Sequence, residues 1–361
     1  MKFDRGRGAT VTNVRRQCRL IYLVTVLMLP LAGVTVTAQS DADAQFSMPH
    51  TAWGHPDLQG TWTMETFTPL QRPEHLGDKA FYSEEELEEL RELLTAEGVD
   101  PLAGNVLAIE DEQEREERLF QTNRDDTYVH YDNELWLRGN TPKGLSSNRT
   151  SLIVDPPNGR LPARTEEAAM GVATRREART GREFDSLEMR PMQERCVGWS
   201  HEGPPMLPPP YNDLMHIMQT PDYVAFVPEL RTNQPRLVPL DGGSHISSKI
   251  EQFSGDSRGR WEGDTLVVET TNFTDKTRFQ GVATSAMHVE ERFTRDGDGT
   301  IRYEFTVTDS DAWTAPWSVE VPMMMRDETM YEYACHEGNH DIGNVLLIYR
   351  NLEKQAAAEG R

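Results

Sequence analysis

Two short stretches of this chain place a histidine beside a carboxylate, and each stretch follows a cysteine. His201-Glu202-Gly203 begins five residues after Cys196, and His336-Glu337-Gly338 begins directly after Cys335. An imidazole next to a carboxylate suits general acid–base catalysis or the binding of a divalent metal. The alternative is that one or both pairs are exposed loop residues. We take His336 and Glu337 as the first candidates for catalytic groups, with His201 and Glu202 in support.

The second pair is also part of a longer motif. Residues 336–340 read HEGNH, which matches H-E-x-x-H. In zinc proteases this motif lies on a helix, with both histidines on one face and the glutamate as general base. Gly338 and Asn339 would occupy the middle of that helix, so a strand-to-helix turn is favoured instead. His336, Glu337 and His340 remain candidate metal ligands, and a divalent metal is the candidate cofactor.

A second motif concerns a serine. Gly255-Asp256-Ser257-Arg258-Gly259 matches G-x-S-x-G, the nucleophile elbow of α/β-hydrolases. The elbow needs a buried strand before the serine and a helix after it. Here a hairpin strand follows, so Ser257 is interpreted as a turn residue.

The cysteines suggest a covalent link between the two candidate pairs. Cys196 and Cys335 are the two cysteines that follow an expected leader peptide, and two cysteines in an oxidising compartment more often pair than stay free. The alternatives are a buried pair of inert thiols and a bridge between two molecules. A disulfide would bring their Cα atoms to about 5.5 Å and hold both His-Glu pairs in one neighbourhood.

The second half of the chain alternates apolar and polar residues along short runs. This alternation is typical of antiparallel strands with one wet face. The clearest signal is a hairpin around Glu262-Gly263-Asp264, where a glycine supplies the positive φ of a tight turn. Further strands are predicted at residues 214–220, 223–227, 236–240, 287–295, 300–308, 317–325 and 329–335.

Helical patterns are concentrated between residues 83 and 195. Ser83 and Glu86 form a capping box, and Gly98 is placed to end that helix. Helices are also predicted at 105–121, 165–179 and 345–354. The charges of this acidic insert are interpreted as solvated faces. The insert could instead cover the mouth of a barrel.

The N-terminal segment and the net charge restrict the location and the partners. Residues 1–38 combine arginines, an apolar run and a Val36-Thr37-Ala38 cleavage site, which predicts a signal peptide and a periplasmic or secreted protein. Residues 39–56 form a polar lead-in. Without the leader, 31 basic and 58 acidic side chains remain, a net charge of −27. Such a surface repels phosphate backbones and anionic lipid, so neither nucleic acid nor a stable membrane anchor is expected.

Several long motifs carry a resemblance to known proteins. PDLQGTW, RTSLIVDPPNGRLP, GDSRGRWEGDTLVVETTNFTDKT, VEERFTR and YEYACHEGN together are similar to an uncharacterised group of exported bacterial proteins. The resemblance covers most of the mature chain and implies export and a single architecture, but no activity. Gly60-Thr61-Trp62 at the first expected strand also resembles the lipocalins, in which the tryptophan closes one end of the barrel.

These observations predict a mainly β protein. Its expected core is an antiparallel, lipocalin-like (calycin-type) β-barrel formed by residues 57–361, with an acidic α-helical insert at about 83–195. Trp62, Trp261, Trp313 and Trp317 would line or plug this barrel. The predicted function is action on a small organic molecule in the barrel mouth, by a hydrolase or lyase that uses the His-Glu pairs. The alternatives are a non-catalytic carrier of an apolar ligand and, more remotely, a structural protein of the cell envelope.

Overall fold

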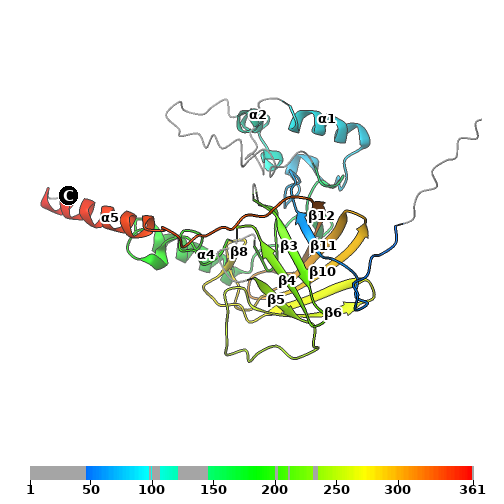
Figure 1. Cartoon of the computed structure of the whole chain (residues 1–361). Helices are drawn as coiled ribbons and strands as arrows, with labels where there is room; N and C mark the ends of the chain where they lie inside the picture. The colour runs from blue at the N-terminus through cyan, green and yellow to red at the C-terminus, as the bar shows by residue number, and fades with distance from the viewer. Residues whose placement is uncertain are drawn as a thin grey trace, which may run out of the picture. The chain divides into compact units, whose positions relative to one another are not determined.

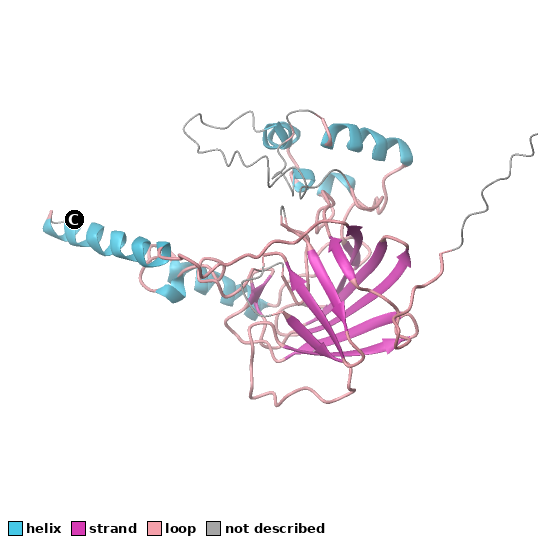
Figure 2. Ribbon diagram, viewed as in Figure 1, coloured by secondary structure: helices cyan, strands magenta, loops and turns pink. Residues whose placement is uncertain are grey.

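Nine antiparallel strands form a nearly closed barrel, and a few helices accompany it (Figures 1 and 2). The computed structural model describes residues 46–96, 99, 106–120, 145–199, 202–209, 212–230 and 235–359. The predicted leader, residues 39–45 of the lead-in, and His201 lie outside the described residues. Within the described part of the chain, no helix is both long enough and apolar enough to span a membrane.

The barrel strands confirm most of the predicted runs. In chain order they are β1 (Gly60–Thr63), β3 (Met215–Gln219), β4 (Tyr223–Pro228), β5 (Arg236–Pro239), β6 (Asp256–Glu262), β7 (Thr265–Thr271), β10 (His288–Gly297), β11 (Thr300–Thr308) and β12 (Trp317–Arg326). They pair in the order β5-β4-β3-β1-β12-β11-β10-β7-β6. The short strand β2 (Ile153–Asp155) pairs with β12, while β8 (Arg278–Phe279) and β9 (Val282–Ala283) form a separate hairpin.

One predicted strand is wrong. Residues 329–335 form no strand, although Tyr331 and Tyr333 alternate with polar neighbours. Both edges of β12 are already paired, with β1 and β11, and the two tyrosines are exposed. Alternation shows that a segment suits a strand, but a strand also needs a free edge to pair with.

The β6–β7 hairpin forms as its sequence predicts. Glu262 faces Thr265 across a two-residue turn, in which Gly263 has φ of +60°. Ser257, however, lies within β6 and not in a turn. Its Oγ is buried and lies 2.9 Å from Oγ1 of Thr270 on β7. A strand and not a helix follows this serine, which removes the context of a nucleophile elbow.

A glycine permits the two end strands of the sheet to approach each other. A Cβ added to Gly259 of β6 would lie 2.8 Å from both Val238 Cγ1 and Leu240 Cδ2, at the end of β5. Contacts that short do not occur between real side chains. The missing side chain therefore lets β5 and β6 pack together and nearly close the barrel.

Substitution of this glycine provides a test of the closure. Gly259→Ala is expected to lower the free energy of unfolding by about 1–3 kcal/mol, because the new methyl group overpacks the seam. Gly299→Ala is the matched control, since its Cβ would meet only Met325 Cβ at 3.8 Å. Urea unfolding of both variants measures the difference. Equal stability of the two variants would contradict the close approach of β5 and β6.

Side chains fill the barrel interior. Along β11, Ile301, Tyr303, Phe305 and Val307 are buried and alternate with more exposed polar residues, as predicted. Buried and more exposed residues also alternate over most of β3, β10 and β12. The largest fully buried side chains are mostly aromatic: Trp62, Trp317, Tyr303, Phe67, Phe226, Phe273, Phe293 and Phe305.

Trp62 packs at one end of this barrel, which confirms its predicted place. Its indole N–H donates to the carbonyl of Leu58 at 3.0 Å, and the guanidinium of Arg295 lies 5.6 Å from the ring centroid. Arg295 in turn donates to the carbonyl of Asp57 at 3.0 Å. Of the other tryptophans, Trp313 and Trp317 are buried in the core, whereas Trp261 is only partly buried.

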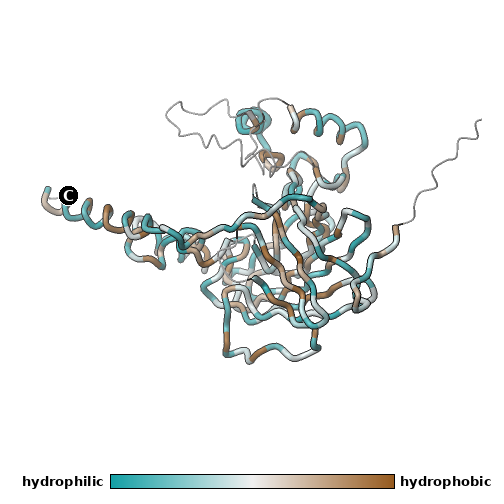
Figure 3. Tube along the Cα trace, viewed as in Figure 1, coloured by the Kyte–Doolittle hydropathy of each residue, from teal (hydrophilic) through white to brown (hydrophobic). Residues whose placement is uncertain are grey.

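The helical insert forms where the capping signals predict it. Helix α1 (Glu84–Leu94) begins with the Ser83–Glu86 capping box and ends at Thr95, earlier than the predicted Gly98. Helix α4 (Glu166–Arg179) is capped by Thr165. Most residues of α1 and α2 are hydrophilic (Figure 3). The remaining helices are α2 (Glu112–Phe120), α5 (Asp341–Ala358) and the single turns η1 (Glu74–Leu76), η2 (Val106–Ala108) and η3 (Leu187–Met189).

Candidate functional site

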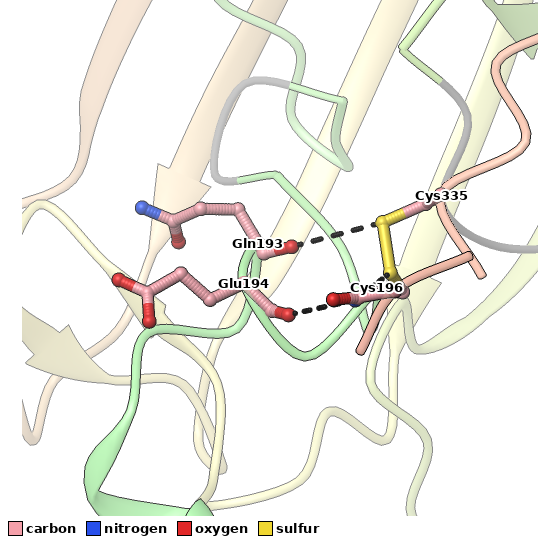
Figure 4. The surroundings of a disulfide bond; sticks show 5 residues. Gln193, Glu194, Cys196 and Cys335 are labelled. Atoms are coloured by element: carbon pink, nitrogen blue, oxygen red, sulfur yellow. Dashed lines mark hydrogen bonds between the residues drawn. A yellow bond between two sulfur atoms is a disulfide. The ribbon is translucent and has the colours of Figure 1, made fainter. Parts of the chain in front are cut away.

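The predicted disulfide between Cys196 and Cys335 is present, with the Cα atoms 5.7 Å apart. Figure 4 shows how it joins Cys335 to the loop that contains Gln193 and Glu194. Asn339 strengthens this junction, because its amide donates to the carbonyl of Glu194 at 3.2 Å. The bond therefore holds the segment before α5 against the loop that precedes Glu202.

The disulfide brings the candidate residues into one region but does not bury them together. His336 and Glu337 are exposed in a turn, and Glu202 is partly buried in the wall of a cavity. His201 lies outside the described residues. His340 is the residue before α5, which begins at Asp341, so the HEGNH motif precedes the helix. It therefore lacks the single helical face that a zinc protease requires.

The cavity lies at the end of the barrel opposite Trp62. Residues just before β6 and β10 and just after β7 contribute to its wall, as do the β8–β9 hairpin and residues from the segments 192–199 and 202–204. Its volume is about 50 Å³. Aromatic and apolar side chains make up about half of the wall, and glycines with polar and charged residues make up the rest. The wall residues include Met192, Val197, Trp199, Glu202, Phe253, Ser254, Phe273, Thr277, Arg278, Phe279, Thr284 and Met287.

The β8–β9 hairpin covers this end of the barrel. Phe279 is buried and stacks on Trp317 at the start of β12, with ring centroids 5.7 Å apart. Beside it, the Thr277 hydroxyl donates to the carbonyl of Thr274 at 2.8 Å and accepts from the Thr284 hydroxyl at 2.7 Å. These contacts satisfy the hydroxyls of Thr277 and Thr284, and Glu202 and Arg278 are the charged residues of the wall.

The proline-rich loop after Glu202 inserts into the same end. Gly203, with φ of +82°, leads into Met206, which is almost completely buried. The Met206 N–H donates to the hydroxyl of Tyr303 at 2.9 Å, and this hydroxyl donates to Glu291 Oε1 at 2.8 Å. Burial raises the pKa of Tyr303 well above its usual range, so the phenol stays neutral and acts as a donor. The loop is thus held inside the barrel by a buried polar network.

Arg236 completes this network. Its guanidinium donates to both carboxylate oxygens of Glu291, at 2.7 and 3.2 Å, and lies 4.7 Å from the centroid of the Phe226 ring. Glu291 is fully buried. A buried carboxylate is tolerated here because a cation and a phenol pair with it.

Two further acidic groups are buried just before β3 and just after β4. Asp213 accepts hydrogen bonds from Thr63 Oγ1 and, at 2.7 Å, from the Met64 N–H. Glu229 accepts from the Leu214 N–H at 3.4 Å. Burial raises the pKa of Glu229 to about 7, and the nearby charges of Asp213 and Glu328 act in the same direction. Burial also raises the pKa of Asp213.

The raised pKa of Glu229 predicts a pH-dependent stability. In the folded state the carboxyl holds its proton up to about pH 7, against 4.5 for an ordinary glutamate. The folded protein therefore binds more protons in this window, and its stability falls as the pH rises from about 4.5 to 7. Glu229→Gln is expected to be more stable than the native chain by about 1–3 kcal/mol at pH 8, and equally stable near pH 4.

Urea unfolding at the two pH values measures this effect. Glu251→Gln is the control, because Glu251 is exposed and the substitution should change little at either pH. A stability difference for Glu229→Gln that is the same at pH 4 and pH 8 would contradict the prediction.

Sequence reasoning missed most of the cavity wall. Trp199, Phe253, Arg278 and Phe279 come from segments far apart in the chain and form no motif. The proline-rich loop after Glu202 was the available signal, since a stiff segment beside a candidate carboxylate suggests a fixed wall.

Sequence reasoning also missed a histidine that pairs with a carboxylate, His245 with Asp256. His245 Nδ1 lies 2.8 Å from Asp256 Oδ2, which also accepts from the Ile246 N–H at 3.2 Å. The residues are eleven apart, with no recognised spacing. In the part of the chain that the structure describes, no three His, Cys, Asp or Glu side chains gather closely enough to hold a metal ion.

The site is therefore a small aromatic cavity with two charged groups, held at one end of an antiparallel barrel by a disulfide-linked loop and a buried polar network. No family model, curated protein or solved structure matches this chain.

Proposed function

We propose that this protein binds a small organic molecule in the cavity at the barrel end. The observation that carries the proposal is the composition of the wall, where Trp199, Phe253 and Phe279 surround a few polar groups. Ligand sites are typically concave, mainly apolar and marked by a few convergent polar groups. In this cavity we propose that Glu202 and Arg278 are the convergent polar groups.

The filled barrel interior supports a binding site at the end of the barrel and not along its axis. Trp62, Tyr303 and Phe305 occupy the space that a carrier with a long apolar tunnel would leave open. A cavity of about 50 Å³ holds a few water-sized groups. It therefore suits a small molecule or one end of a larger one.

A second candidate is an acid–base enzyme, a hydrolase or lyase, that acts on the same ligand. The observation in its favour is that a carboxylate, Glu202, lies in the wall of the cavity. The disulfide also tethers His336 and Glu337 to the loop that forms this wall. A glutamate beside a bound ligand suits general acid–base catalysis.

We also propose a lipocalin-like (calycin-type) barrel and export to the periplasm or the medium. The first proposal is supported by Gly60-Thr61-Trp62 in the first strand, with Trp62 packed beneath Arg295 at a barrel end. The second is supported by the Cys196–Cys335 disulfide, since such bonds persist mainly in oxidising compartments.

A panel of small aromatic and aliphatic molecules screened by ligand-observed NMR tests the binding function. Hits should also quench the fluorescence of Trp199, and Trp199→Phe should remove that signal. Ser254→Trp should abolish binding, because Ser254 lies in the wall and the new ring fills the cavity. Ser247→Trp is the control, since Ser247 is exposed in the same connecting segment. Binding that survives Ser254→Trp, or no binding by any compound, would contradict the proposal.

The compounds that bind in this screen can also be used to distinguish a binding protein from an enzyme. Prolonged incubation followed by NMR detects any product. Glu202→Gln should stop turnover and leave binding measurable if Glu202 acts as an acid or base. Unchanged spectra for every bound compound would favour the binding function alone.

A further inference from the structure

We infer that the ligand of the barrel-end cavity is a small organic carboxylate whose acid group binds Arg278. The inference rests on the proposed function, because it names the class of molecule that the same cavity takes. Three features of the cavity and its surroundings carry it: Arg278 in the wall, the cations around the β8–β9 hairpin, and the charge of Glu202.

Arg278 is held in place but is not fully paired. Its Nη1 donates to the backbone carbonyls of Asp275 and, at 2.6 Å, Thr277. Its Nε–H is buried and has no hydrogen-bond partner among the described residues. A buried donor on a charged group is costly when it is left unpaired, and a carboxylate oxygen is its strongest partner. The protein thus orients the side chain but leaves its Nε–H without an acceptor among the described residues.

Other cations gather around the same hairpin. Arg164 donates to the carbonyl of Gln280 at 2.9 Å, and Arg175 donates to the carbonyl of Gly281 at 2.6 Å. Arg179 lies near enough to Arg175 to repel it, and Lys276 precedes the hairpin. Glu188, which interacts with Lys276, and Asp275, which precedes Lys276 in the sequence, offset part of this charge. In a chain of net charge −22, such a local excess of cations attracts anions toward the cavity.

Glu202 limits the charge of the ligand. Glu202 shares the wall with Arg278, so its negative charge repels a second negative charge in a cavity of about 50 Å³. A single carboxylate with an apolar body satisfies the guanidinium and fits the aromatic wall. A phosphate monoester, with nearly two charges, meets more repulsion.

Four compounds that share one ring and differ in charge test this class: benzoate, benzamide, benzylamine and phenyl phosphate. Binding is measured by fluorescence titration and NMR at low salt. Benzoate is expected to bind at least 10-fold more tightly than the other three. Arg278→Gln should weaken benzoate by at least 10-fold and leave benzamide unchanged. Arg292→Gln, an exposed arginine on β10, is the control and should change neither.

Arg278→Lys keeps the charge but removes the planar donor, so it should weaken benzoate less than Arg278→Gln does. This variant also guards against a general loss of folding, which would weaken every compound equally. Benzamide or benzylamine binding as tightly as benzoate would overturn the inference while the binding function stands. Tighter binding of phenyl phosphate than of benzoate would indicate a phosphate ligand and would also overturn the inference. If none of the four binds and Ser254→Trp has no effect on any compound of the wider panel, the proposed function itself fails.

Discussion

Arg236→Met is expected to lower the free energy of unfolding by about 3–5 kcal/mol, because it leaves the buried charge of Glu291 without its cation. The side chain of Glu291 is 0% exposed and that of Arg236 is 11% exposed. Water therefore cannot replace the lost partner, and the Tyr303 hydroxyl supplies only one hydrogen bond. Urea unfolding followed by tryptophan fluorescence measures the loss.

A matched control separates this effect from the general loss of an arginine. Arg292→Met removes a guanidinium on the outer face of β10 that pairs with Glu262 at 3.0 Å, where both side chains are well exposed. Its cost should stay below about 1 kcal/mol. In the double variant Arg236→Met/Glu291→Gln no buried charge remains and the tyrosine keeps an acceptor, so much of the stability should return. A loss below 1 kcal/mol for Arg236→Met alone would mean that water reaches Glu291.

Removal of the disulfide is the second large effect. Cys196 and Cys335 are 139 residues apart, and in the chain-entropy account a cross-link over such a loop stabilises the fold by up to about 5 kcal/mol. The double variant Cys196→Ser/Cys335→Ser should approach that loss. Reduction of the native protein with dithiothreitol should match it, and urea unfolding compares the two.

The same experiment reports on the site. The 193–199 loop lines the cavity, and the disulfide ties it to Cys335, so ligand binding should also weaken when the bond is absent. Thiol labelling of the unreduced chain without its leader should find no free cysteine. Detection of two free thiols would contradict the bond, and an unchanged ligand affinity after reduction would show that the loop keeps its place without it.

Local patterns in the sequence were sufficient for the individual elements. The capping box at Ser83 predicted the start of α1, and Glu262-Gly263-Asp264 predicted the turn of the β6–β7 hairpin. Alternation along 300–308 predicted β11 and its buried face. These features depend on neighbours within one turn or one strand, so the chain specifies them locally. The two cysteines after the leader likewise left one simple intramolecular pairing.

Tertiary structure decided what those elements place together. The sequence could not show that residues 329–335 would find no free strand edge, or that Ser257 would face Thr270 across a hairpin. Arg236 and Glu291 form an ion pair although 55 residues separate them, because both side chains point from their strands, β5 and β10, into the barrel interior. Arg278 likewise shares a wall with Glu202 only after the hairpin covers the barrel end. Contacts of this kind depend on strand order and closure, which no local pattern encodes. The sequence therefore determined most of the strands, the capped helices and the disulfide partners. The tertiary structure decided which charged residues lie together at the end of the barrel, because they come from segments that only the closed barrel brings together.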